Sequence, residues 1–162
     1  MTPAWTSFMI AAAGASAALA GLVVVAMSVN IARIISFPHL PARAAATIAA
    51  LLLILIVSMA ALIPQSMLSF GIEAFVASVG CWLMQVWAGR WMLVARRNGN
   101  RPWYEPLRGI ILGQVETLPF IIGSVMVAFA EPSGFAWIAA GTLAAFTLSM
   151  YNAWVLLVEI LR

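Results

Sequence analysis

Five long apolar segments constrain this chain more than any other feature. A helix needs about 20 apolar residues to cross a hydrocarbon core about 30 Å thick, and each segment reaches that length. The connections between them are short and contain helix-breaking runs such as "PQSMLSFG" and "EPSG". We therefore predict an all-α membrane protein, one domain over residues 1–162 that forms a five-transmembrane-helix bundle with helices at about residues 5–35, 42–63, 71–95, 108–130 and 135–160.

Composition supports this assignment and excludes several functions. Hydrophobic residues make up 65% of the chain and charged residues 8%, and the mean hydropathy is +1.08. The eight basic residues are all Arg and lie beside apolar segments, so we expect no nucleic-acid partner. One Cys and one His leave no disulfide within the chain and no His-rich metal cluster. Because HExxH, paired Asp and nucleophile-elbow motifs are also missing, we expect neither an enzyme nor a cofactor.

The arginines predict an orientation. The second and fourth connections contain none, and an odd number of spans places the first connection, the third connection and the C-terminus on one side. Because basic residues gather on the cytoplasmic side of a membrane, we predict an outside N-terminus and a cytoplasmic C-terminus. The residues that carry this prediction are Arg33, Arg43, Arg90, Arg96, Arg97, Arg101, Arg108 and Arg162.

Small residues mark two candidate helix-packing faces. Apolar side chains gain little by leaving lipid for one another, so membrane helices associate where small residues let their backbones approach. These faces can serve packing within the chain, self-association or a pore lining. Four-residue spacing pairs Gly14 with Ala18 and Ala17 with Gly21 in the first segment, and relates Gly141, Ala145 and Ser149 in the fifth.

Polar side chains inside the third and fourth segments predict an intramembrane cluster. Gln85 and Arg90 lie in the third segment, and Gln114 and Glu116 lie in the fourth. If these segments form a hairpin, Arg90 and Glu116 come to face each other, and pairing lowers the cost of both charges. Pro119 also leaves a backbone acceptor beside Glu116. Such a pair is either structural or part of a conduction or coupling pathway.

Five further positions belong to these expectations. Asn30 and Asn152 either complete the polar cluster or bond to neighbouring carbonyl groups. Glu73, near the outer end of the third helix, is either solvated or attracts cations at an outer mouth. Trp87 and Trp91 share a helical face that can form the floor of a ligand pocket or contact lipid or another helix.

The first segment resembles the opening helix of small bacterial membrane proteins, some of which carry the label "modulator of FtsH protease". The resemblance implies a bacterial inner-membrane location. It covers mainly this helix, where a small-residue run precedes a Gly-Leu pair and an apolar stretch ending in Asn, which here comprise Gly21, Leu22, Val25, Ala26, Ser28, Val29 and Asn30.

The run "ALAGLVVVAMS" is also similar to the pore helix of Orai calcium channels. The acidic selectivity position of that family corresponds here to Ser28, which has no carboxylate, and the predicted orientation is opposite. The sequence leaves two function classes open. One is a homo-oligomeric ion channel or small transporter for a small ion, with membrane lipids around it. The other is a non-transporting membrane regulator or assembly factor, for example of a membrane protease.

Overall fold

The structure, a computed structural model, describes residues 2–29, 31–36, 40–97 and 104–161, and within them it contains helices and no strand. Five helices are long and apolar enough to cross a membrane, which confirms the predicted helical class and number of candidate spans. The helices are α1 (Pro3–Val29), α2 (Ile31–Ser36), α3 (Leu40–Leu62), α4 (Met67–Arg97), α5 (Tyr104–Ala128) and α6 (Gly134–Leu161).

The boundaries differ from the predicted ones at the first helix and at the starts of α4 and α5, each of which begins four residues earlier than expected. The predicted first helix is two helices, because α1 and the short α2 lie on either side of residue 30. The 27 residues of α1 already extend about 40 Å at 1.5 Å per residue, so α2 is not needed to complete the span. At the other end of the bundle, α4 begins earlier than expected, where the Ser66 hydroxyl accepts a hydrogen bond from the Ser69 amide at 3.1 Å and caps the helix.

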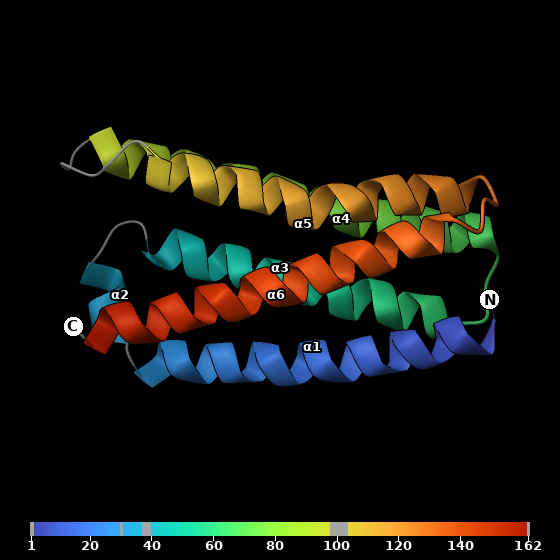
Figure 1. Ribbon diagram of the computed structural model, residues 1–162, viewed down its shortest axis with the longest axis horizontal. Coiled ribbons are helices and arrows are strands. Elements are labelled where there is room, and N and C mark those ends of the chain that lie inside the picture. The colour runs from blue at the N-terminus through green and yellow to red at the C-terminus, as the bar shows by residue number, and fades with distance from the viewer. Residues whose placement is uncertain (1, 30, 37–39, 98–103, 162) are drawn as a thin grey trace.

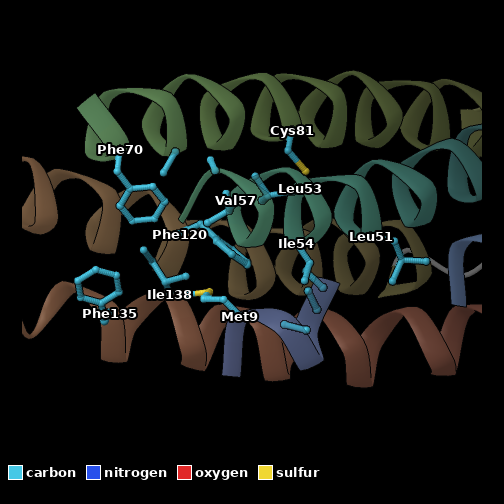
Figure 2. Packing of buried hydrophobic residues seen from close by; sticks show 14 of the residues in the cluster. Met9, Leu51, Leu53, Ile54, Val57, Phe70, Cys81, Phe120, Phe135 and Ile138 are labelled. Atoms are coloured by element: carbon cyan, nitrogen blue, oxygen red, sulfur yellow. The ribbon is translucent and has the colours of Figure 1, made fainter. Parts of the chain in front are cut away.

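Helix α3 is the central element. Figure 1 shows α3 beside α6, with the antiparallel α4–α5 pair along one side and α1 along the other. In the most apolar stretch of α3, half of the residues are buried inside the protein, compared with 22% of the residues in the corresponding stretch of α1. Side chains from α1, α3, α4, α5 and α6 meet in the core around Leu53, Ile54 and Val57, as Figure 2 shows. The chain ends lie at opposite ends of the bundle (Figure 1).

Glycines bring α4, α5 and α6 into close contact at the end of the bundle that holds the N-terminus. A Cβ atom on Gly71 of α4 would lie 2.6 Å from the Cα atom of Ala128 in α5. Gly123 of α5 and Gly134 of α6 face each other, and a Cβ atom on either would lie within 2.7 Å of the other's carbonyl oxygen. These contacts were absent from the predicted packing faces. Close backbone approach without a side chain between them therefore holds this end together.

A left-handed residue makes the tight turn between α5 and α6. Ala130 has a φ of 59°, a conformation that non-glycine residues rarely adopt. Its amide bonds to the Val127 carbonyl at 2.9 Å, and the Glu131 amide bonds to the Met126 carbonyl at 2.9 Å. This Schellman arrangement satisfies the last carbonyl groups of α5 and sends the chain directly into α6.

The two small-residue faces have different surroundings. On α6, Gly141 and Ala145 are buried, and a Cβ atom on Gly141 would lie 2.8 Å from the Phe120 ring of α5. On α1, Gly14, Ala18 and Gly21 are exposed, and no atom lies within 4 Å of a Cβ atom built on either glycine. Helix α1 packs on α3 through the residues on another side of the helix, which are Met9, Ala12, Ser16 and Val23.

Candidate functional site

Glu116 is a buried acidic side chain where three helices meet. It lies on α5, and its side chain is only 5% exposed. The Gln85 side-chain amide, on α4, donates a hydrogen bond to Glu116 Oε1. The same Gln85 nitrogen lies 3.4 Å from the carbonyl oxygen of Ala46 on α3 and donates to it. Gln85 thus connects the carboxyl group to the backbone of the central helix.

The local sequence around Glu116 makes room for this contact. A Cβ atom on Gly113 would lie 3.1 Å from Gln85 Oε1, so the glycine lets the amide approach α5. The Thr117 hydroxyl turns back to its own helix and donates to the Gly113 carbonyl at 2.7 Å. The site therefore depends on two features. Gly113 has no side chain where α5 meets α4, and the Gln85 side chain of α4 is long enough to reach Glu116 there.

Pro119 lies inside α5, one turn beyond Glu116. Proline has no backbone N–H, so the carbonyl of Val115 loses the donor that the helix would otherwise supply. In a hydrocarbon environment such an acceptor must be satisfied by the protein, by a polar ligand or by water. Val115 is the residue directly before Glu116, but a helical side chain leans toward the N-terminal end whereas the carbonyl points toward the C-terminal end. The Val115 carbonyl therefore faces Pro119, and the carboxyl group of Glu116 points away from it.

The predicted ion pair between Arg90 and Glu116 is not formed, because Arg90 is exposed whereas Glu116 is buried. Gly89 packs against Ile110, and Gln85 lies against Gly113. This register places Arg90 about seven residues, or about 10 Å, along the hairpin from Glu116. Arg90 also lies about 140° around α4 from Gln85, since each residue of a helix turns about 100°. Both the depth and the direction of Arg90 therefore exclude the pair.

Gln114 also lies apart from Glu116. It precedes Glu116 by two residues, so it points about 200° away around α5. Its side-chain oxygen accepts a hydrogen bond from the Trp82 indole nitrogen at 2.8 Å. Sequence reasoning assigned no partner to Gln114, although Trp82 is a long donor at a matching level of the hairpin. This contact joins α4 and α5 on another side from the Glu116 site.

Asn152 binds an arginine from the central helix. Its side-chain oxygen accepts hydrogen bonds from Arg43 Nε at 3.1 Å and Arg43 Nη2 at 2.9 Å, which ties α6 to α3. The neighbouring Tyr151 accepts a hydrogen bond from Arg108 of α5, whose guanidinium carbon lies 5.1 Å from the centre of the Tyr151 ring. The sequence predicted neither partner. Asn30, the other asparagine in the prediction, lies outside the described residues.

Glu73 is exposed near the opposite end of the bundle. Its carboxylate accepts a hydrogen bond from the Gln65 amide at 2.9 Å, and the same amide donates to the Ala60 carbonyl at 2.9 Å. This contact fastens the start of α4 to the end of α3. It lies far along α4 from Gln85, so Glu73 and Glu116 belong to different sites.

The donor set at Glu116 does not resemble a multidentate metal site. Among the residues that the structure describes, no group of three His, Cys, Asp or Glu side chains is placed to hold a metal ion. Cys81, the one cysteine of the chain, is buried, and Figure 2 shows it pointing from α4 toward α3. The arrangement therefore offers one carboxyl group, one amide and backbone oxygens, which can hold a single proton or a weakly bound cation.

Replacing Gln85 tests the geometry of the site. Gln85→Leu removes the donor to Glu116 and should lower the free energy of unfolding by about 1–3 kcal/mol, the cost of leaving a buried polar group unsatisfied. Arg90→Met should change it by less than about 0.5 kcal/mol, because Arg90 is exposed. Thermal unfolding in one detergent measures both variants. A larger loss for Arg90→Met than for Gln85→Leu would contradict the structure and favour the ion pair.

Comparison with known proteins identifies no relative. No protein family model matches the chain, and no curated protein or solved structure matches it. The resemblances of the first helix to other membrane proteins therefore stay predictions. The functional assignment rests on the geometry of the buried carboxyl group and its surroundings.

Proposed function

We propose that this protein moves a small cation, either a proton or a metal ion, across a membrane as a homo-oligomer, and that Glu116 binds the cation on its way. One observation carries the proposal. Within a candidate membrane span, Glu116 is buried, and its hydrogen-bond partner is the neutral amide of Gln85. Ionisable groups inside membrane spans commonly mark ion pathways and proton relays.

Charge balance supports a mobile cation at Glu116. An ionised side chain at the centre of a span costs about 3 kcal/mol on insertion scales. A fixed basic partner would offset this cost, but the residue predicted for that role, Arg90, is exposed on another side of α4. The part of the chain that the structure describes shows no ion pair to Glu116. A bound proton or cation then provides the balancing charge. Its release on the other side of the membrane leaves Glu116 free to bind the next one.

The depth of Glu116 suits a binding site within a pathway. Helix α5 runs from Tyr104 to Ala128, so Glu116 lies at its middle, about 18 Å from either end. The backbone oxygen near the site is that of Ala46, which accepts from the same Gln85 amide as Glu116 does. A cation that reaches the middle of the span therefore meets a carboxyl group and a carbonyl oxygen that share one amide.

Flux through proteoliposomes tests the role of Glu116. The unmodified protein should dissipate a proton gradient or a monovalent-cation gradient, and Glu116→Gln should reduce the flux to that of empty liposomes. The amide removes the charge but keeps an acceptor for the Gln85 hydrogen bond, so the variant should fold. Flux is measured with a pH-sensitive dye inside the vesicles, and in parallel with cation-sensitive dyes.

Glu131→Gln is the matched control. Glu131 is an exposed acid in the connection after α5, where it accepts a hydrogen bond from Ser133, and its replacement should leave the flux unchanged. If Glu116→Gln transports as well as the unmodified protein, Glu116 is not the binding group. If the unmodified protein carries no cation at all, the transport proposal is wrong and the non-transporting regulator becomes the better assignment.

The exposed face of α1 supports the homo-oligomeric part of the proposal. Gly14, Ala18 and Gly21 form a short stretch without bulky side chains in the middle of α1, the least buried of the five spans, between exposed Ile10 and Val25 on the same side of the helix. Packing within the chain leaves this surface uncovered. Close approach of a second α1 helix would bring the two backbones together, as small residues permit between membrane helices. Self-association would also provide space between protomers for a pathway.

Leucine substitutions test this face. Gly14→Leu and Gly21→Leu should shift the protein toward monomers, because each adds a bulky side chain where the backbones would meet. Gly80→Leu is the control, because Gly80 of α4 is also exposed, with no atom within 4 Å of a Cβ atom. Energy transfer between labelled protomers in liposomes measures association. Unchanged transfer in both α1 variants, or a monomeric unmodified protein, would exclude the α1 interface.

The orientation that we propose is an outside N-terminus and a cytoplasmic C-terminus in a bacterial inner membrane. It rests on the arginines, of which Arg43 and Arg108 lie at the C-terminal end of the bundle. Single cysteines at Ser66 and Ser133, both exposed, should react with an impermeant maleimide from the periplasmic side in a Cys81→Ser background. A cysteine at exposed Ser36 should not. The reverse pattern would invert the topology.

A further inference from the structure

Arg90 occupies an unusual place for a charged residue. It lies on α4 within the candidate membrane span Met67–Val94, and its Cα atom is about 10 Å before the end of the helix at Arg97. The side chain is exposed, and no ion pair or hydrogen bond joins it to another residue in the described part of the chain. Because an unpaired guanidinium facing lipid is costly, a counter-charge from outside the protein is expected.

Two tryptophans flank Arg90 on the same surface. Trp87 precedes it by three residues and Trp91 follows it directly, so all three side chains fall within about 100° of the α4 circumference. Both indole rings are about half exposed, and their centres lie 6.1 Å apart in an edge-to-face arrangement. Tryptophan prefers the level of lipid headgroups, with its ring against the upper acyl chains.

We propose that Arg90, Trp87 and Trp91 form a binding site for the headgroup phosphate of an anionic phospholipid. The long Arg90 side chain extends along the last turns of α4 toward the membrane surface, which brings its guanidinium toward the phosphate level. Its planar guanidinium donates two parallel hydrogen bonds to phosphate oxygens. The two indole rings contact the glycerol and the first methylene groups below it. The site is independent of the proposed transport function.

Charge complementarity selects an anionic lipid over a zwitterionic one. A zwitterionic headgroup carries an ammonium group that competes with Arg90 for its own phosphate and leaves no net charge to balance the guanidinium. An anionic headgroup such as phosphatidylglycerol has no such competitor, and one basic residue near anionic lipid gains about 1 kcal/mol. The chain is basic overall, with a formal net charge of +3, which also favours anionic lipid around it.

Arg108 gives an internal comparison at the same level of the hairpin. Gly89 contacts Ile110, and Gly109 lies against Met92, so Arg90 and Arg108 lie at nearly equal depth on neighbouring helices. Arg108 is exposed too, but it donates to Tyr151 of α6 and lies over its ring. Its guanidinium is therefore already engaged. The two arginines differ in available hydrogen-bonding capacity rather than in charge or depth.

Lipid retention tests the proposal. The purified protein is equilibrated in mixed micelles with equal amounts of phosphatidylglycerol and phosphatidylethanolamine, and bound lipids are counted by native mass spectrometry. Arg90→Gln should reduce the occupancy of phosphatidylglycerol about fivefold, the factor that corresponds to 1 kcal/mol. Arg90→Lys should retain part of it, because the charge stays while the two-pronged contact is lost. Arg108→Gln removes the same charge and should retain the occupancy of the unmodified protein.

The outcomes separate a specific site from a general charge effect. Equal losses in Arg90→Gln and Arg108→Gln would overturn the proposal, because net charge alone would then explain retention. An equal fall in both lipids for Arg90→Gln would overturn its selectivity for anionic headgroups. Unchanged retention in Arg90→Gln would exclude the site. Monodisperse elution of each variant confirms folding, which is expected for Arg90 because its side chain contacts no polar partner among the described residues.

Discussion

The hydrocarbon environment requires that backbone polar groups be satisfied within the protein, and the rest of this structure depends on that requirement. It makes every candidate span a helix and leaves little hydrophobic gain for bringing one helix against another. Specific contacts then decide the packing. Gly71, Gly123 and Gly134 permit backbone contact at one end of the bundle, and Arg43 and Arg108 bind α6 to its neighbours at the other.

The same requirement gives the Glu116 site its chemical character. The carboxyl group is placed between α3, α4 and α5 by a single amide, Gln85, rather than by a basic residue. A fixed ion pair would make the site electrically complete and hold both partners in place. A neutral amide orients the carboxyl group without cancelling a charge on it, and in the proposed function a mobile cation provides the balance. This difference is the basis for proposing a transport role for Glu116 rather than a structural one.

Two surfaces face away from the core and have different chemistry. The outer face of α1 has small residues and no charge, which suits another helix. The outer face of α4 near its C-terminal end has an arginine beside a pair of tryptophans, which suits a lipid headgroup. Because the two faces are on separate helices, with α3 between them in Figure 1, the proposed self-association and the proposed lipid binding would use different surfaces.

The sequence by itself determined the class of the fold and the five candidate spans, because the thickness of a membrane sets the length and hydropathy of each spanning segment. It also showed that the arginines lie beside particular connections between these segments. It also singled out Glu116 as an ionisable group at depth. It did not determine which side of each helix faces the core. Lipid and core are both apolar, so no polar stripe marks the outer face of a span as it does in a soluble protein.

Only the tertiary structure decided the helix register and rotation, and through them the partners of each polar residue. Arg90 was expected beside Glu116, but the packing of Gly89 on Ile110 sets it at another depth and turns it outward. Gln85 contacts Glu116 instead, because it lies about 140° away from Arg90 around α4, on the side that faces α5. Gly141 is buried and Gly14 exposed for the same reason, since small-residue spacing identifies a surface that can pack closely but not the neighbour that covers it.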